Sequence, residues 1–343
     1  YNDGTLANHG VIVVTINYRL GIFGFFAHPE LTRESPHHAS GNYGLMDQIL
    51  ALHWVRDNIA HFGGDPEDIT IFGQSAGSMD AGALMTSHLA RGLFQKVIAE
   101  SGAAISFGPS PLSQAEQLGA QFASSFAIPA GQHPIAYLRG LPAQELIARA
   151  ADSHSSPITP DVDGYVIPQT PAKVFRDGDE APVPLLIGTT SREFGSPETP
   201  DQTRKRIEET AGQYAPQFLA AYGLSGNGHG EDDPLYGSPA SQYSADMGFH
   251  CPITTEALWH MDAHQPTYEY EFDHAIPGQE AQGAVHSADL PYAFGYFPIV
   301  GNISGPFGPI DKHLAELVQS YWTNFAKTGN PNSVDVPAWP TLD

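Results

Sequence analysis

The sequence predicts an α/β fold, in which helices cover both faces of a mostly parallel central sheet. Short apolar, β-branched segments, typical of strands buried on both faces, alternate along the chain with helical segments that have one apolar face. Hydrophobic residues make up 41% of the chain and charged residues 15%, which is the composition of a globular protein with a sizeable core. The 343 residues are enough for one large α/β domain.

The first hundred residues contain three of the expected strands. Val11–Asn17 is a continuous apolar run that predicts a strand buried on both faces. A helix from about Tyr43 to Ala60 follows, because apolar residues recur there every three or four positions. Asp68–Phe72 and Lys96–Glu100 are the next predicted strands, and a second helix begins after Gly77. This alternation favours a parallel sheet.

The second half of the chain continues the pattern more sparsely. Pro184–Gly188 predicts a fourth strand and Tyr268–Phe272 a fifth. The last helix is expected to begin near Asp311, which has the side chain of a good N-cap. Gly329 lies where that helix should end.

The strand pattern lapses near residues 110–180 and again near residues 200–250. Both stretches contain short helical pieces and polar loops rich in glycine and proline. We interpret them as insertions that cover the pocket of a single domain spanning residues 1–343, and not as separate domains.

Composition excludes several classes of function. With 15 basic and 38 acidic residues, the formal net charge is −23, which disfavours binding to nucleic acid or to anionic lipid. No apolar run approaches the roughly 18 residues that a spanning helix needs. The single cysteine, Cys251, is expected to be a small buried residue and not a catalytic thiol. The acidic segment 225–233, with His229, is interpreted as a solvated loop, so no metal and no cofactor is predicted.

The segment Gly73-Gln74-Ser75-Ala76-Gly77 has the Gly-x-Ser-x-Gly pattern of a nucleophilic serine. It follows a predicted strand and opens a predicted helix, which is the arrangement that a nucleophile elbow requires. Glycines at positions 73 and 77 are expected to let the strand and helix pass closely. The backbone N–H of Ala76 is expected to donate to the oxyanion. The pattern therefore indicates a serine hydrolase whose nucleophile is Ser75.

A serine hydroxyl needs a base, and the base needs an acid that orients it. In folds of this kind the chain order is serine, acid, histidine. Glu193 follows the fourth predicted strand and His286 follows the fifth, so both should face Ser75. Position alone leaves alternatives open, because the chain has 16 histidines. The alternative acids are Glu198, Asp201 and Asp289.

Several long segments closely resemble the type-B carboxylesterase family, which includes cholinesterases and bacterial para-nitrobenzyl esterases. The resemblance extends almost from end to end and implies the α/β-hydrolase fold. The segments that carry it are Thr15–Gly21, Gly41–Gln48, Phe62–Pro66 through Ser75–Gly77, Leu93–Phe94, Glu100–Gly102, Trp322–Ala326 and Gly329–Pro331.

The resemblance also implies the catalytic residues. Gly188–Glu193 is similar to the acid loop of the family, although the usual Asp-Glu-Gly reads Arg192-Glu193-Phe194 here. Gly283–His286 is similar to its histidine loop. A Ser75–Glu193–His286 triad is therefore implied, with Ser101 as a weaker match to a serine that helps hold the acid.

The implied reaction is hydrolysis of small carboxylic esters through an acyl-enzyme. Activity should fall below about pH 6, because the histidine must be neutral to act as a base. The alternatives are a non-catalytic cholinesterase-like binding module and an inactive fragment. The pattern does not distinguish aryl, feruloyl and aliphatic esters, and it does not predict an oligomeric state.

The resemblance further implies that the N-terminal strands and the His-Gly-Gly-Gly oxyanion loop of the family are missing from this chain. One missing strand would lie between Val11–Asn17 and Asp68–Phe72. We expect a fragment truncated at both ends, with any signal region outside it. A secreted or periplasmic location is favoured over a cytoplasmic one. Asn302-Ile303-Ser304 is a glycosylation sequon if the protein is secreted by a eukaryote.

Overall fold

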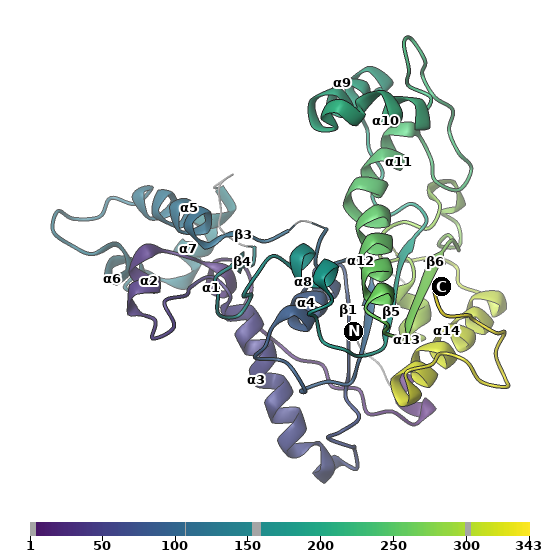
Figure 1. Cartoon of the computed structure of the whole chain (residues 1–343), viewed down its shortest axis with the longest axis horizontal. Helices are drawn as coiled ribbons and strands as arrows, with labels where there is room; N and C mark the ends of the chain where they lie inside the picture. Colours follow the sequence, from purple (N-terminus) through teal and green to yellow (C-terminus); the bar gives the residue numbers. More distant parts are fainter. Residues whose placement is uncertain (1–4, 107, 153–158, 299–302) are drawn as a thin grey trace.

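The computed structural model describes residues 5–106, 108–152, 159–298 and 303–343, so Asn302 of the sequon lies outside the described residues. Its centre is a sheet of four parallel strands in the order β1-β2-β5-β6 (Figure 1). The strands are β1 (Thr70–Gln74), β2 (Lys96–Glu100), β5 (Leu185–Thr190) and β6 (Thr267–Phe272). The predicted α/β architecture is confirmed.

Helices pack on both faces of this sheet because successive side chains of each strand point to opposite sides. On β5, Leu185 and Ile187 belong to one core and Leu186 to the other, and all three are fully buried. The first core includes side chains from α3 (Tyr43–Asn58), α4 (Ala76–Thr86), α8 (Pro171–Asp177) and α12 (Cys251–Asp262). The second includes side chains from α13 (Leu290–Phe294) and α14 (Pro309–Thr328).

Two groups of helices extend away from the sheet (Figure 1). The first combines N-terminal and mid-chain elements: α1 (Gly21–Phe25), α2 (Pro29–Glu34), α5 (Leu112–Ser124), α6 (Pro134–Arg139) and α7 (Ala143–Asp152), with the short parallel pair β3 (Ser110–Pro111) and β4 (Asp161–Val162). The second contains α9 (Pro200–Thr210), α10 (Ala215–Ala221) and α11 (Pro239–Ala245). That these stretches are pocket-covering insertions stays a prediction.

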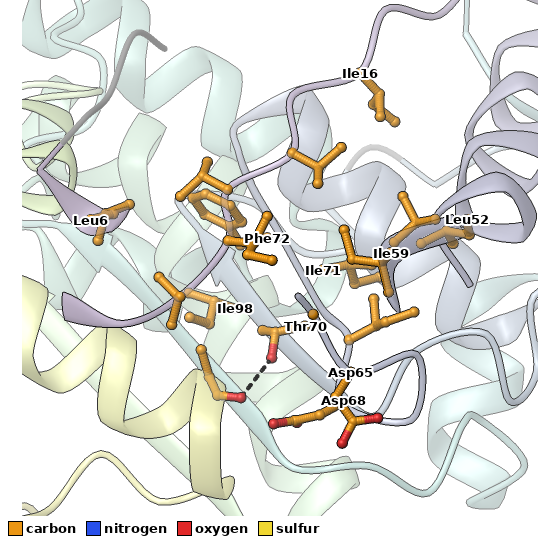
Figure 2. A pocket seen from close by; sticks show the side chains of 18 of the residues that line it. Leu6, Ile16, Leu52, Ile59, Asp65, Asp68, Thr70, Ile71, Phe72 and Ile98 are labelled. Carbon is orange, nitrogen blue, oxygen red and sulfur yellow. Dashed lines mark hydrogen bonds between the residues drawn. The ribbon is translucent and has the colours of Figure 1, made fainter. Parts of the chain in front are cut away.

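The expected strand at Val11–Asn17 is wrong. The segment pairs with no strand among the described residues, and Ile12, Val14 and Ile16 are 46%, 39% and 41% exposed. A groove of about 440 Å³, with largely apolar lining, lies between this segment and β1 (Figure 2). A strand needs a neighbour about 4.8 Å away for its backbone hydrogen bonds, and apolar composition alone cannot supply one. Within the described residues, β1 is therefore an edge of the sheet.

Two further expectations need correction. Cys251 is exposed, because it opens α12 at the surface instead of packing in a core. Asp311 is not the N-cap of the last helix, which begins at Pro309. The Asp311 carboxylate instead lies inside the first turn and accepts the backbone N–H of Gly308 at 2.7 Å. The predicted end of this helix is confirmed, since Gly329 follows it in the left-handed conformation.

Asp161 on β4 predicts a pH dependence of stability. Its side chain is fully buried, and neither carboxylate oxygen has a hydrogen-bond partner in the described part of the chain. Burial, together with the charges of Asp163 and Glu116, raises the pKa of Asp161 to about 8. An unfolded aspartate titrates near 4, so the folded state holds a proton that the unfolded state releases. The free energy of unfolding should therefore fall between about pH 4 and pH 8.

Replacing Asp161 with asparagine should remove part of this dependence. We expect the difference between urea unfolding free energies at pH 5 and pH 8 to shrink by roughly 3–4 kcal/mol, because the folded-state pKa near 8 lies far above the unfolded value across most of that window. Asp335→Asn, at an exposed position, is the control for the change in net charge. An unchanged pH dependence in the Asp161→Asn variant would show that this carboxyl is ionised in the folded protein.

Candidate functional site

Ser75 lies on a strained turn between β1 and α4. Its backbone has φ 57° and ψ −120°, a conformation that is unfavourable for a residue with a side chain. The turn is compact, because a Cβ atom at Gly73 would lie 2.5 Å from the backbone of Gly77. A Cβ atom at Gly77 would meet nothing within 4 Å, so the expected clash at that glycine is wrong. Ala76 is the first residue of α4, where backbone N–H groups lack helical acceptors.

Glu193 and His286 are brought together although 93 residues separate them. The His286 Nδ1 atom bonds to the Glu193 Oε2 atom, and the other oxygen, Oε1, accepts the backbone N–H of Thr190 at 3.0 Å. Their backbones are joined as well, since His286 N–H donates to the Glu193 carbonyl at 2.8 Å. Glu193 is 1% exposed. A buried carboxylate on Nδ1 holds the proton on that nitrogen and leaves Nε2 as an acceptor.

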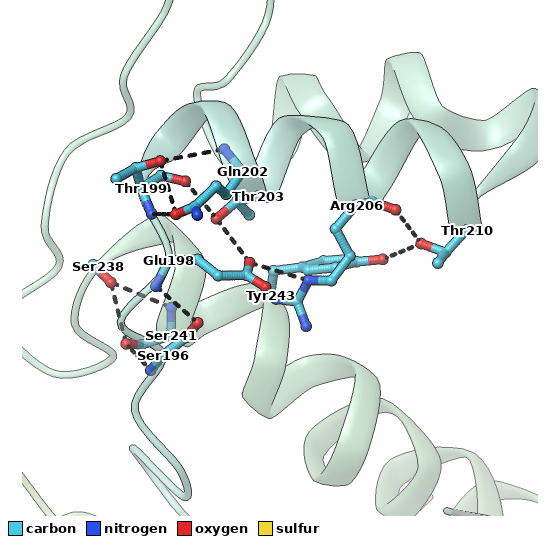
Figure 3. Close-up of polar contacts among 10 residues, drawn as sticks. All are labelled: Ser196, Glu198, Thr199, Gln202, Thr203, Arg206, Thr210, Ser238, Ser241 and Tyr243. Atoms are coloured by element: carbon cyan, nitrogen blue, oxygen red, sulfur yellow. Dashed lines mark hydrogen bonds and ion pairs between the residues drawn. The ribbon is translucent and has the colours of Figure 1, made fainter.

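The two alternative acids that follow Glu193 in sequence have other partners. Glu198 lies beside α9, where its Oε2 contacts the Arg206 Nε atom at 3.2 Å and accepts the Thr203 hydroxyl (Figure 3). Asp201 pairs with Arg204 on the same helix. Both carboxylates are therefore neutralised within the α9 region, and the described bonds of His286 do not include them.

The third alternative, Asp289, lies behind the Glu193–His286 pair. It is buried and accepts the Tyr270 hydroxyl at 3.1 Å. Burial and the charge of Glu193 raise the pKa of Asp289 to about 6. Burial and the charge of Asp289 raise the pKa of Glu100 to about 8. Burial and the charge of Asp289 thus both favour the protonated form of Glu100, which limits the negative charge beside Asp289.

The Nε2 atom of His286 contacts Gln74, not Ser75. Its distance to the Gln74 Nε2 atom is 3.1 Å. With the proton on Nδ1, the Nε2 lone pair accepts a hydrogen bond from the Gln74 amide. No hydrogen bond in the described residues joins the Ser75 hydroxyl to His286, and such bonds often form only when substrate is bound.

Two phenylalanines surround the imidazole of His286. The ring of Phe194 stacks on it with centroids 4.3 Å apart, and the ring of Phe249 lies at 5.2 Å. Phe194 is half exposed, whereas Phe249 is buried. These rings limit the rotation of the imidazole and form an apolar wall beside it.

Arg192 joins the acid loop to two other loops. Its guanidinium donates to the carbonyls of Pro234, Leu235 and Ala281 at 2.9–3.0 Å. The expected support from Ser101 is not seen, because its buried hydroxyl makes no hydrogen bond within the described residues.

The sequence alone did not assign roles to Gln74 or Phe249. Gln74 lies inside the nucleophile motif, so its position beside Ser75 could have indicated a role at the site. The sequence Arg192-Glu193-Phe194 departs from the family pattern, because a large side chain replaces glycine next to the acid. This departure could have indicated that residue 194 contacts the catalytic histidine. Nothing in the local sequence marks Phe249, which reaches His286 only through the tertiary fold.

Among the described residues, no group of three or more histidine, cysteine, aspartate or glutamate side chains is arranged to hold a metal ion. Within the same residues, every helix is too short or too polar to span a bilayer.

A parallel sheet with a strained serine at a strand-to-helix turn, and an acid and a histidine after later strands, defines the α/β-hydrolase fold. A model of the carboxylesterase family matches residues 1–343. The chain belongs to the carboxylesterase family.

Curated relatives and solved structures agree with this assignment. Human "Neuroligin-2" is 34% identical over 97% of this chain and 42% of its own length. Rat "Pyrethroid hydrolase Ces2e" is 33% identical over 99% of this chain and 62% of its own. Pig "Liver carboxylesterase" is 33% identical over 100% of this chain and 65% of its own length. A solved PNB esterase structure is 34% identical, with a TM-score of 0.80, over 99% of this chain and 70% of that one. The chain thus spans less than two thirds of these curated relatives.

Proposed function

We propose that the protein hydrolyses small carboxylic esters through an acyl-enzyme formed on Ser75. The observation that carries this proposal is the buried Glu193 carboxylate bonded to His286 Nδ1, while His286 Nε2 lies 3.1 Å from Gln74, the residue before a serine on a strained turn. This arrangement supplies the nucleophile, the base and the group that orients the base.

In the proposed reaction, the Ser75 oxygen attacks the ester carbonyl carbon while His286 Nε2 takes its proton. The imidazolium is stabilised by Glu193 through Nδ1–H. The N–H of Ala76 donates to the oxygen that becomes negative. His286 then gives its proton to the leaving alcohol, and a water molecule repeats the sequence to release the acid. Before the first step, the Gln74 amide must leave the Nε2 lone pair.

The esterase proposal extends to partners and location. The substrate is expected to be a small ester without negative charge, because a net charge of −23 repels anions. A secreted or periplasmic location remains our proposal, and fractionation of the source cells tests it.

Covalent labelling tests the nucleophile directly. A fluorophosphonate probe should attach to Ser75, because a phosphonyl group mimics the tetrahedral intermediate that the site would stabilise. Mass spectrometry of the tryptic peptide that contains residue 75 should show the added mass. Near-UV circular dichroism of the same sample establishes that the protein is folded.

The second candidate is a non-catalytic binding module, which the identity to human "Neuroligin-2" supports. A folded protein that stays unlabelled by the fluorophosphonate favours this candidate over the esterase.

A further inference from the structure

His250 has hydrogen-bond partners on both of its ring nitrogens. It is the last residue of a π-helical turn, Asp246–His250, that joins α11 to α12. Its Nδ1 atom lies 2.9 Å from Asp246 Oδ1, and its Nε2 atom lies 3.0 Å from the backbone carbonyl oxygen of Thr190. Only 17% of the side chain is exposed. π-Helical turns are rare and occur often at functional sites.

These two partners define the protonation state of the ring. A backbone carbonyl can only accept, and the Asp246 carboxylate already accepts the Tyr222 hydroxyl at 2.7 Å. With Asp246 ionised, both partners are acceptors, and the two contacts are satisfied together only when both nitrogens of His250 carry hydrogen, as in an imidazolium. Burial lowers the pKa of His250, but the bonds to Asp246 and the Thr190 carbonyl outweigh that cost, and the pKa is raised.

Several groups around His250 favour its positive charge and oppose the cost of burial. On its own turn it faces Asp246, and the ring of Tyr236 lies edge-on at 6.2 Å. A cavity of about 490 Å³ beside it is also lined by Glu269 and Glu271 of β6, and its described lining includes no lysine or arginine. The charge of Glu193 acts in the same direction.

The same turn is linked to both members of the acid–histidine pair, to His286 directly and to Glu193 through Thr190. Thr190 accepts from His250 through its carbonyl and donates through its N–H to Glu193 Oε1 at 3.0 Å. Phe249, the residue before His250, packs against the ring of His286. The end of β5 is thus fixed between the imidazolium on one side and the Glu193 carboxylate on the other.

We propose that His250, as an imidazolium, is a positioning residue that holds the end of β5 so that Glu193 orients His286. This inference rests on the proposed esterase function. When His250 loses its proton, one ring nitrogen loses its hydrogen, so the bonds to Asp246 and Thr190 cannot both persist. The Glu193 carboxylate then loses its fixed orientation. As a result, kcat falls as the pH rises, while KM changes little.

The test is kinetic and compares three variants from pH 5 to pH 10 with a neutral short-chain para-nitrophenyl ester, corrected for spontaneous hydrolysis. His250→Gln should lower kcat roughly ten- to hundredfold, with KM within about twofold, and should remove the alkaline fall in kcat. Asp246→Asn should move that fall to lower pH by about one unit, because the imidazolium loses its counter-ion. Tyr222→Phe removes neither partner of His250, so the alkaline fall in kcat should persist. Because Asp246 loses a hydrogen-bond donor in this variant, the fall should not move to lower pH, in contrast to Asp246→Asn.

Imidazole NMR of the wild-type protein supplies a reading that needs no activity. At pH 7, His250 should show protons on both ring nitrogens, and a neutral ring would overturn the inference even if a variant fails to fold. The inference is also wrong if the wild type is active and reacts with the fluorophosphonate, but the His250→Gln variant still shows the alkaline fall in kcat. A folded wild type that neither hydrolyses ester nor reacts with the fluorophosphonate refutes the esterase proposal itself, and the inference falls with it.

Discussion

Replacing Ser75 with alanine will lower kcat for ester hydrolysis by about four to six orders of magnitude. The hydroxyl is the only part of the side chain that can form the acyl-enzyme, and alanine leaves no group to take its place. The fold should survive, because alanine is smaller and the conformational strain at φ 57° is the same for both residues.

Steady-state kinetics and the fluorophosphonate reaction should change together in this variant. Ser124→Ala, at an exposed position on α5, is the matched control and should behave as the wild type. A folded Ser75→Ala variant that retains even a tenth of the wild-type kcat would show that another residue forms the acyl-enzyme.

Replacing Glu193 with glutamine will lower kcat by roughly three to four orders of magnitude. The glutamine carbonyl oxygen can still accept the Thr190 N–H, so its amide nitrogen must face His286 Nδ1. That amide donates a hydrogen bond, which moves the imidazole proton to Nε2. The lone pair that should take the Ser75 proton is then lost, and the imidazolium has no counter-ion.

Glu198→Gln is the control that separates this effect from a general change of charge. Glu198 lies five residues along the chain and pairs with Arg206, away from the described contacts of His286 (Figure 3). Its replacement should leave kcat within about twofold of the wild type. If both variants lost activity equally, the role of Glu193 as the orienting acid would be wrong.

The strands that could be predicted from sequence are those whose evidence is local. The whole of β2, Lys96–Glu100, was predicted residue for residue, because it is buried on both faces and its sequence is continuously apolar at the centre. Val11–Asn17 has the same kind of composition but no partner strand beside it. Pairing depends on what lies next to a segment in space, and composition does not contain that information.

The site shows the same division between local and tertiary evidence. The Ser75 turn follows from the glycine spacing and the flanking strand and helix, whereas Glu193 and His286 depended on family resemblance. The contact between Gln74 and His286 spans 212 residues, and that between His250 and Thr190 spans 60. The fold creates such contacts between residues that are far apart in the sequence, so no sequence motif predicts them.

The edge of β1 has a consequence for the solution behaviour of this chain. β1 is paired with β2 on one side only, and in the described part of the chain its other edge faces an apolar groove, which makes it a template for backbone pairing with another polypeptide. The net charge of −23 opposes this, because copies of the chain repel one another. Repulsion over such distances is screened within about 10 Å at 0.1 M salt. Ionic strength therefore controls the colloidal stability of the chain, with dilute buffer keeping copies apart and concentrated salt allowing their edges to meet.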